Sequence, residues 1–416
     1  MRSRTSVLIR VALLPALLAA LVLSVLTATP AQAQKIRPDY FGMHDPNWTT
    51  PPPVAIGAAN FTTSGTYWQF VERRKNRFAW THLDSQVRAA ESMGAQPMIV
   101  LGRTPKFHSS RSGSKEFYTY MPSMKAWNRW VSKVANRYGK RLDYQIWPEP
   151  NITQNWKGTP AQLAKLTASA SKIIKRVDRK AKVVGPAMTL RMAKQRENML
   201  KYYKQSVGGR RIHTYLDVIA IDTFPEQDGL PEDSYALMKL AKKQLARIGV
   251  KRKPFWNNEI NYGVAGGGQA TSTSYPIALQ QSFVIRTFVL SAAARMARTY
   301  WLGWFNTKTM AVSMTDADGN KAAPGTSYVT VRNWLLGTGF DGCRKDSAGL
   351  WTCIAKTPTT TRKIYWMQSG TRSKNVIVPA GTTRIENQSG GNVTSTHPPG
   401  TAISVNYQPV MIEVLN

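Results

Sequence analysis

The chain has 416 residues, of which 56 are lysine or arginine and 23 are aspartate or glutamate, and its formal charge is +33 at pH 7. Nucleic acid is the usual partner of so basic a protein, but the sequence has no zinc-ligand spacing, no RNA-binding aromatic motif and no helix-turn-helix signature. We therefore predict no nucleic-acid partner, and the length allows one large and one small domain.

The first 33 residues have the order of a secretory signal peptide. Arg2, Arg4 and Arg10 precede a long apolar stretch, and the AQA at residues 31–33 suits signal peptidase. An uncleaved membrane anchor is the alternative, because the apolar stretch is long for a signal. Loss of three arginines leaves a charge of 33 − 3 = +30, and no later run could span a bilayer. We expect a secreted protein whose charge either holds it near anionic cell-envelope polymers or only makes it soluble.

Residues 34–339 alternate between short runs of β-branched and aromatic residues and amphipathic helical stretches. The runs predicted to be strands are YFGMHD from Tyr40, VAIGAANF from Val54, QPMIVLG from Gln96, LDYQIW from Leu142, AKVVG from Ala181, LDVIAID from Leu216, KPFWNNE from Lys253 and RTYWLGW from Arg298.

The helical stretches between these runs carry clear boundary signals. One begins with Thr159 as N-cap and Pro160 at the first helical position, and another ends at Gly249. Eight strand and helix units are what a closed barrel requires. An open doubly wound sheet is the alternative, but no glycine-rich fingerprint follows the first strand. We predict an α/β fold, a (β/α)8 TIM barrel that acts as a catalytic domain.

Residues 340–416 have a different character, with short alternating runs rich in Gly, Pro, Thr and Ser and no helical period. This pattern predicts a small C-terminal antiparallel β-sandwich. Cys343 and Cys353 lie in GCRKDSAGLWTC. An even number of cysteines in an oxidising compartment favours a disulfide across the first hairpin over a metal site.

Two glutamates lie at the ends of predicted strands. Glu149 in YQIWPEPN follows the fourth strand, and Glu259 in KPFWNNEINYG ends the seventh. Functional groups of a (β/α)8 barrel gather at the C-terminal ends of its strands. Glycoside hydrolysis needs one carboxyl group to protonate the leaving oxygen and a second at the anomeric carbon. Each glutamate alone is most simply a surface acid, but the pair in a chain poor in acids is predicted to be catalytic.

Polar and aromatic residues near the same strand ends are candidates for binding a sugar. Tryptophan faces stack on pyranose C–H surfaces. Buried barrel tryptophans are also common, so we expect two or three of five, Trp147 included, to contact glycan. A structural role is the alternative for His44, for His108 and for Asn151, which could orient its loop. The candidate substrate-binding residues are His44, Trp68, Asn151, Asp222, Trp256, Asn258, Trp301 and Trp304. No metal or cofactor is predicted.

The two glutamate motifs resemble those of a known clan of glycoside hydrolases. YQIWPEPN is similar to its W-N-E-P-N acid/base motif, and KPFWNNEINYG resembles its nucleophile strand. GTYWQFVERRKNRFAWTHLDSQVRAAESMGAQPMIVLGRTPKF resembles family 39 and its relatives, and the C-terminal segment resembles the small sandwich of exported members. The resemblance implies that Glu149 is the general acid/base and Glu259 the nucleophile of a retaining mechanism, with the two carboxyl groups about 5 to 5.5 Å apart.

The sequence departs from that pattern at three places. Pro148 replaces the Asn that precedes the acid/base, no Arg lies between Pro51 and Glu72, and Asp222 occupies a strand that commonly has His-x-Tyr. We expect a retaining glycoside hydrolase acting on an extracellular or cell-envelope polysaccharide, an anionic one if the charge is functional. A β-xylosidase-like exo-enzyme is the second possibility. A barrel that has lost catalysis and only binds cell-envelope glycan is the alternative from a different class.

Overall fold

The computed structural model describes residues 35–44, 48, 50–62, 65–305, 308–368 and 372–416. The predicted signal peptide, residues 1–33, therefore lies outside the described residues. Within the described ranges, no helix is long and apolar enough to cross a membrane.

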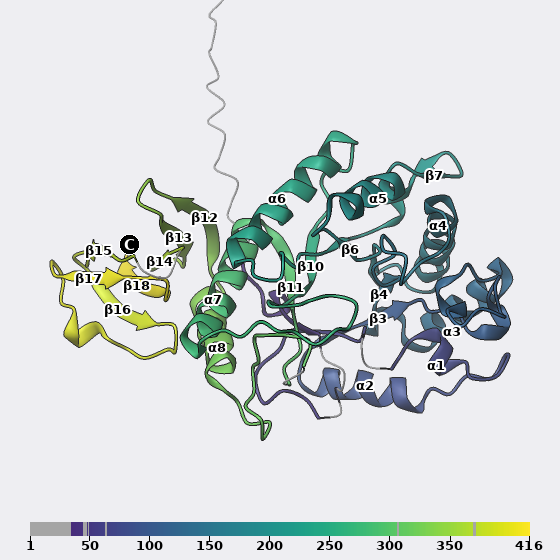
Figure 1. Ribbon diagram of the computed structural model, residues 1–416, viewed down its shortest axis with the longest axis horizontal. Coiled ribbons are helices and arrows are strands. Elements are labelled where there is room, and N and C mark those ends of the chain that lie inside the picture. Colours follow the sequence, from purple (N-terminus) through teal and green to yellow (C-terminus); the bar gives the residue numbers. More distant parts are fainter. Residues whose placement is uncertain (1–34, 45–47, 49, 63–64, 306–307, 369–371) are drawn as a thin grey trace, which may run out of the picture. The chain divides into compact units, whose positions relative to one another are not determined.

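A single parallel sheet closes on itself to form the barrel (Figure 1). Its strand order is β5-β4-β3-β2-β1-β11-β10-β9-β6. β5 and β6, at the two ends of this order, are consecutive pieces of the fifth barrel strand. A parallel bridge from Val184 in β5 to Val218, just before β9, closes the sheet. The strands are β1 (Phe41–His44), β2 (Ala58–Asn60), β3 (Gln96–Leu101), β4 (Asp143–Ile146), β5 (Val183–Val184), β6 (Met188–Thr189), β9 (Ile219–Asp222), β10 (Phe255–Ile260) and β11 (Met296–Leu302).

The prediction of a (β/α)8 barrel is confirmed, and each of the eight predicted runs overlaps a barrel strand. The fifth strand differs from its predicted form, because AKVVG supplies only β5 and the pairing with β9 is made by the separate piece β6. Residues 185–187 connect the two pieces, so the chain changes here from pairing with β4 to pairing with β9.

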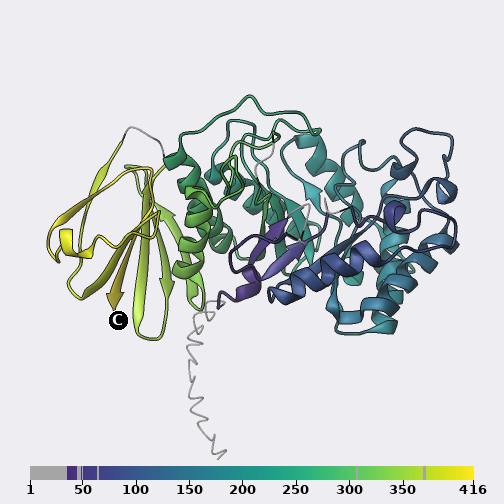
Figure 2. The same ribbon diagram turned by 90° about the horizontal axis from the view of Figure 1, so that it is seen from below.

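Helices follow the strands and cover the outside of the barrel (Figures 1 and 2). Thr159 and Gln162 form a reciprocal capping box at the start of α4, with Pro160 at its first position, as the sequence predicts. The helices are α1 (Trp68–Val71), α2 (Thr81–Ser92), α3 (Met124–Tyr138), α4 (Pro160–Val177), α5 (Ala193–Tyr203), α6 (Pro231–Arg247), α7 (Ile277–Ala293) and α8 (Ala323–Leu335). A short hairpin, β7 (Ser206–Val207) with β8 (Arg210–Arg211), precedes β9.

The barrel interior is polar at mid-height. Asn258 on β10 donates a 3.0 Å hydrogen bond to the Gln145 side chain on β4, and Asn60 on β2 donates to the Asn258 carbonyl over 3.4 Å. All three side chains are buried. Buried amides bonded to one another tie non-adjacent strands together at little net cost.

The C-terminal region forms two antiparallel sheets, which confirms the predicted small β domain. One has the order β12-β13-β14-β18-β16, and the other pairs β15 with β17. A separate apolar cluster between the sheets includes Tyr365, Ile385, Ile403 and Ile412. The strands are β12 (Gly339–Lys345), β13 (Leu350–Lys356), β14 (Thr360–Met367), β15 (Lys374–Ile377), β16 (Thr382–Asn387), β17 (Ala402–Val405) and β18 (Val410–Leu415).

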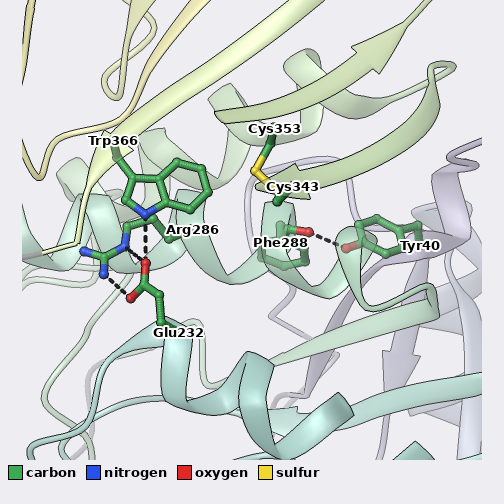
Figure 3. Close-up of a disulfide and its surroundings, with 7 residues drawn as sticks. All are labelled: Tyr40, Glu232, Arg286, Phe288, Cys343, Cys353 and Trp366. Atoms are coloured by element: carbon green, nitrogen blue, oxygen red, sulfur yellow. Dashed lines mark hydrogen bonds and ion pairs between the residues drawn. A yellow bond between two sulfur atoms is a disulfide. The ribbon is translucent and has the colours of Figure 1, made fainter. Parts of the chain in front are cut away.

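A disulfide joins Cys343 on β12 to Cys353, its register partner on β13, as the sequence predicts (Figure 3). Beside it, the domain is attached to the barrel by a buried polar cluster. Trp366 Nε1 donates a 2.7 Å hydrogen bond to Glu232 on α6, and Glu232 also forms a buried ion pair with Arg286 on α7. Three elements from both regions therefore share one buried carboxylate.

Candidate active site

Glu149 lies on a strained turn directly after β4. Trp147 has φ 59° and Glu149 has φ 38°, although neither is glycine and Pro148 stands between them. Such conformations are uncommon for bulky residues, cost about 1 to 3 kcal/mol each, and concentrate at functional sites. Gly102, at the end of the third strand, lets the turn approach, because a Cβ there would lie 3.0 Å from Pro148 Cδ. The turn therefore fixes the direction in which the Glu149 carboxyl group points.

The Glu149 carboxyl group is held from one side by an amide. Asn155 Nδ2 donates a 2.9 Å hydrogen bond to Glu149 Oε2. The other end of this amide accepts a 2.6 Å hydrogen bond from Arg103, which follows β3. The Arg103 guanidinium lies over the rings of Tyr118 and Tyr67, at 4.9 and 5.5 Å from their centroids. A continuous chain of contacts thus links the acid to aromatic side chains from two other loops.

A second arginine acts on the same carboxyl group. Arg191 follows β6, is half-buried, and exerts an electrostatic effect on Glu149. Its guanidinium reaches the loop after β10, where Nη1 lies 4.0 Å from the position that a Cβ on Gly266 would take. Two cations from different barrel loops therefore lie within electrostatic range of the acid.

Glu259 is the penultimate residue of β10, across the barrel mouth from Glu149. Its Oε2 lies 3.4 Å from Nδ1 of His44, a fully buried side chain at the end of β1. The Glu259 side chain keeps about 16% of its surface exposed, so a ligand in the mouth can reach it. The structure places the predicted site residue His44 against the predicted nucleophile.

Asp222 ends β9 and is the register partner of Glu259. Its carboxyl group is buried, and neither oxygen has a hydrogen-bond partner among the described residues. Burial raises the pKa of Asp222 well above its usual range, and the charges of Glu259 and Glu149 raise it further. Burial and the two glutamate charges therefore all favour the protonated form of Asp222.

The pKa of Glu149 is raised from 4.5 to about 8. Burial is the largest cause, and the negative charge of Glu259 adds to it. The hydrogen bond from Asn155 and the charges of Arg103 and Arg191 oppose the shift by favouring the ionised form. Glu149 thus holds a proton at neutral pH, in electrostatic contact with Glu259 across the mouth.

Two predicted substrate-binding amides prove to be structural. Asn151 is buried and exchanges hydrogen bonds with the backbone of Thr189, and it also donates to Gln195 O, so it fixes the acid/base loop to β6 and α5. Asn258 is 1% exposed and bonded to Gln145 inside the barrel. For Asn151 this is the loop-orienting role that the sequence also suggested. The expectation that Asn258 binds substrate is corrected, because its side chain is buried inside the barrel and its N–H group donates to Gln145.

The expectation that the tryptophans offer stacking faces to a sugar is also corrected. Trp147 and the four predicted to bind substrate are 0 to 2% exposed. Trp68 stacks on His108 and Trp130 and donates to Glu72. His108 likewise contacts Glu72 and is structural. Large apolar rings gain most from full burial between the barrel and its helices.

The remaining three predicted tryptophans pack in different layers. Trp256 lies in the lower interior of the barrel beside Tyr300, with the Arg298 guanidinium 4.1 Å above its ring. Trp301 packs near Tyr262 outside the sheet, and Trp304 packs against Tyr328 of α8. None of them presents a ring face to the barrel mouth.

The sequence reasoning missed the residues that surround Glu149. Asn155, Arg103 and Arg191 all lie in loops that follow barrel strands, and none was predicted to be part of the site. The available signal was their position shortly after the predicted strands three, four and five. Arg103 also has a positive φ of 62°, which the sequence could not reveal.

A two-carboxylate site at the C-terminal ends of strands four and seven of a (β/α)8 barrel defines the class of retaining glycoside hydrolases. Residues 66–279 match the family described as "Glycosyl hydrolases family 39". This range is more than half of the chain, and the protein belongs to that family.

A curated relative is the "Beta-xylosidase" of Caldicellulosiruptor saccharolyticus, 29% identical over 128 residues. The match covers 27% of this chain and 26% of that relative, so the chain spans about a quarter of its length.

Solved structures agree with the fold. A monomeric beta-xylosidase from Caulobacter crescentus matches with a TM-score of 0.64 and 13% identity, covering 92% of this chain and 98% of that one. A glucosidase from Croceicoccus marinus matches with a TM-score of 0.63 and 13% identity, covering 92% and 97%. At such low identity these likenesses establish the fold alone.

Proposed function

We propose that this protein is a secreted enzyme that hydrolyses O-glycosidic bonds of an acidic extracellular or cell-envelope polysaccharide with net retention. Glu149 is the general acid/base and Glu259 the nucleophile. The observation that carries the proposal is the pairing at the barrel mouth of a protonated Glu149, with a pKa of about 8, and a partly exposed Glu259.

The first step forms a covalent intermediate. A Glu259 oxygen attacks the anomeric carbon, the bond from that carbon to the leaving oxygen breaks, and Glu149 gives its proton to the leaving oxygen. In the second step water attacks the same carbon, Glu149 takes a proton from the water, and the bond to Glu259 breaks. Both carboxyl groups return to their starting states, and two inversions give retention.

The surroundings of each carboxyl group fit its proposed role. Burial and the charge of Glu259 keep the proton on Glu149 before the bond breaks. Once Glu259 is esterified its charge is gone, which lowers the pKa of Glu149 and prepares it to act as the base. The buried His44 ring lies beside the Glu259 carboxylate, with Nδ1 3.4 Å from Oε2. The raised pKa of Asp222 favours its protonated form, which adds no negative charge beside Glu259.

Arg103 and Arg191 support an acidic substrate. Both lie on loops around the mouth and act on Glu149. A carboxylate or sulfate on the sugar would neutralise one of them and so raise the pKa of Glu149 in the complex. The net charge of the secreted chain, +30 after loss of the three signal arginines from +33, would also concentrate acidic polymers near the protein. Export rests on the signal-like first 33 residues.

The test compares an acidic polysaccharide with its carboxyl-reduced, neutral form, as substrates for the wild type and for Arg191→Met. We expect the wild type to prefer the acidic form and Arg191→Met to lose most of that preference. Lys194→Met is the matched control, because Lys194 is a nearby exposed cation in a surface ion pair with Glu197. Equal turnover of both forms by the wild type would contradict the acidic substrate and leave a β-xylosidase-like neutral glycan as the substrate.

The alternative that the barrel has lost catalysis is tested separately on a carbohydrate array. Wild type and Glu259→Ala are compared for both binding and product release. The proposal requires that Glu259→Ala abolish product release. If wild type and Glu259→Ala both bind glycan and neither releases product, the protein is instead a barrel that only binds glycan. Pro148, in place of the usual Asn, first raised that alternative.

A further inference from the structure

A cavity of about 480 Å³ lies at the opposite end of the barrel from Glu149 and Glu259. Its walls come from the segments that precede β1, β2, β3, β4 and β5, from the start of β3 and from Arg298 near the start of β11, so it opens at the N-terminal ends of the strands. This volume is in the range of small-molecule sites. Its charged lining residues are Arg37, Asp39, Glu91, Arg141, Lys182 and Arg298.

Most of these charges neutralise one another. Arg141 is paired with Glu91 through two hydrogen bonds of 2.8 and 2.7 Å. Arg298 is buried between Asp39, at 3.0 Å, and Asp143, at 2.6 Å. Arg298 and Arg141 therefore already have carboxylate partners, the first buried and the second partly exposed.

Arg37 and Lys182 are the other two cations of the lining. Arg37 reaches Asp39 only at 3.4 Å, and its side chain is 75% exposed. None of the carboxylates in the described chain forms an ion pair with Lys182. Its ammonium instead lies 5.6 Å from the centre of the Trp256 ring, and the Arg298 guanidinium lies near the same ring. The lining therefore has four cations and two carboxylates, and counting Asp143 beside Arg298 leaves an excess of 4 − 3 = 1 positive charge.

The surroundings of Lys182 are electrostatically unfavourable for its charged form. Burial, followed by the charge of Arg298, lowers the pKa of its ammonium group. The charges of Asp143 and Asp39 oppose this shift, although neither forms an ion pair with Lys182. An anion that enters the cavity would compensate the burial of this cation further through charge-assisted hydrogen bonds.

We propose that this cavity is a second, non-catalytic site that binds one oxyanion group, a phosphate or a carboxylate, through Lys182 with Arg37 at its rim. The site lies at the far end of the barrel and uses no residue of the proposed active site, so it stands or falls independently of the hydrolase activity. The volume leaves room for the sugar or other small unit that carries the anion.

The test is isothermal titration calorimetry at low ionic strength with two probes, inorganic phosphate and glucuronate, which distinguish a phosphate from a carboxylate. We expect at least one probe to bind the wild type, Lys182→Met to weaken that binding roughly tenfold or more, and Lys182→Arg to keep it. Lys165→Met, on the exposed face of α4, is the charge-matched control and should change nothing. Arg191→Met separates this site from the barrel mouth, because it should weaken any binding of glucuronate at the mouth and leave the Lys182-dependent binding unchanged.

Thermal unfolding in a chloride buffer that contains neither probe checks that each variant is folded. Should Lys182→Met not fold, Arg37→Gln takes its place, because Arg37 is largely exposed and its loss should weaken binding severalfold. Equal affinity in wild type and Lys182→Met, or binding that is lost only in Arg191→Met, would overturn the proposal. Absence of any binding by the wild type would overturn it as well.

Discussion

The Asn155 side-chain amide donates a 2.9 Å hydrogen bond to the Glu149 carboxyl group. The same amide accepts a hydrogen bond from Arg103, so its orientation is fixed and it presents its N–H to the acid. In a site where Pro148 has no side-chain donor, Asn155 is the polar contact that positions the acid/base. Because an N–H donor favours the ionised carboxylate, the amide also limits how far the Glu149 pKa rises.

Asn155→Ala should therefore raise the pKa of Glu149. Activity requires Glu149 to be protonated, so kcat/KM of the wild type should fall as pH increases through about 8, and the variant should lose activity at higher pH. We also expect kcat at the optimum to drop about tenfold, because the acid is less well oriented. The pH profile of kcat/KM measures both effects. Gln154→Ala, an exposed neighbour, is the control, and a basic limb that moves to lower pH would contradict this role.

Glu149→Gln should stabilise the folded protein at neutral pH. Unfolded Glu149 loses its proton near pH 4.5 and folded Glu149 near pH 8, so between these values the folded state holds more protons. Raising the pH then favours unfolding, and the wild type loses stability that the glutamine variant keeps. We expect the variant to gain ~1–3 kcal/mol between pH 5 and pH 8. Urea denaturation at both pH values measures this difference, which should be close to zero at pH 5.

The same substitution should reveal the acid role in the kinetics. Glu149→Gln removes the proton donor, so kcat/KM should fall by roughly 10²- to 10⁴-fold for a natural sugar leaving group. An aryl glycoside with an acidic phenol needs little protonation, and its glycosylation step should slow much less. Steady-state rates on the two substrate types test this contrast. A uniform loss on both would assign Glu149 a structural role instead.

Attachment of the C-terminal domain should depend on Glu232. Glu232→Gln leaves the fully buried Arg286 without its counter-ion, which should lower the free energy of unfolding by about 3 to 5 kcal/mol. Trp366→Phe removes only one neutral donor to Glu232 and should cost about 1 to 3 kcal/mol. Chemical denaturation measures both. Lys374→Ala, which breaks an exposed pair with Asp346, is the control and should stay within ~0.5 kcal/mol of the wild type.

The barrel could be predicted from the sequence because its signals are local. Runs of β-branched residues, the Thr159 cap and the stop at Gly249 act within a few residues of chain, and α4 and α6 follow them. The split of the fifth strand into β5 and β6 could not be predicted in this way. It depends on which neighbour each piece pairs with, and that is decided by the closed sheet as a whole.

The site was predictable only in part. Strand ends locate Glu149, Glu259, His44 and Asp222, because the C-terminal ends of parallel strands converge. The tryptophans were misassigned because a ring beside a strand end can face the mouth, the interior or the helices, and sequence spacing does not distinguish these. Asn155 was missed since its contact with Glu149 arises from a turn with two positive φ angles, which residue identity does not reveal.

The most direct test of the account is mass spectrometry of the purified protein after reaction with a panel of 2-fluoro glycosyl probes, uronic-acid types included, with Glu259→Gln as the control. The account predicts a covalent adduct on Glu259 in the wild type, none in the variant, and the strongest labelling by an acidic sugar. An adduct on another carboxylate, or no adduct from any probe while glycan binding is intact, would contradict a retaining hydrolase that uses Glu259 as its nucleophile.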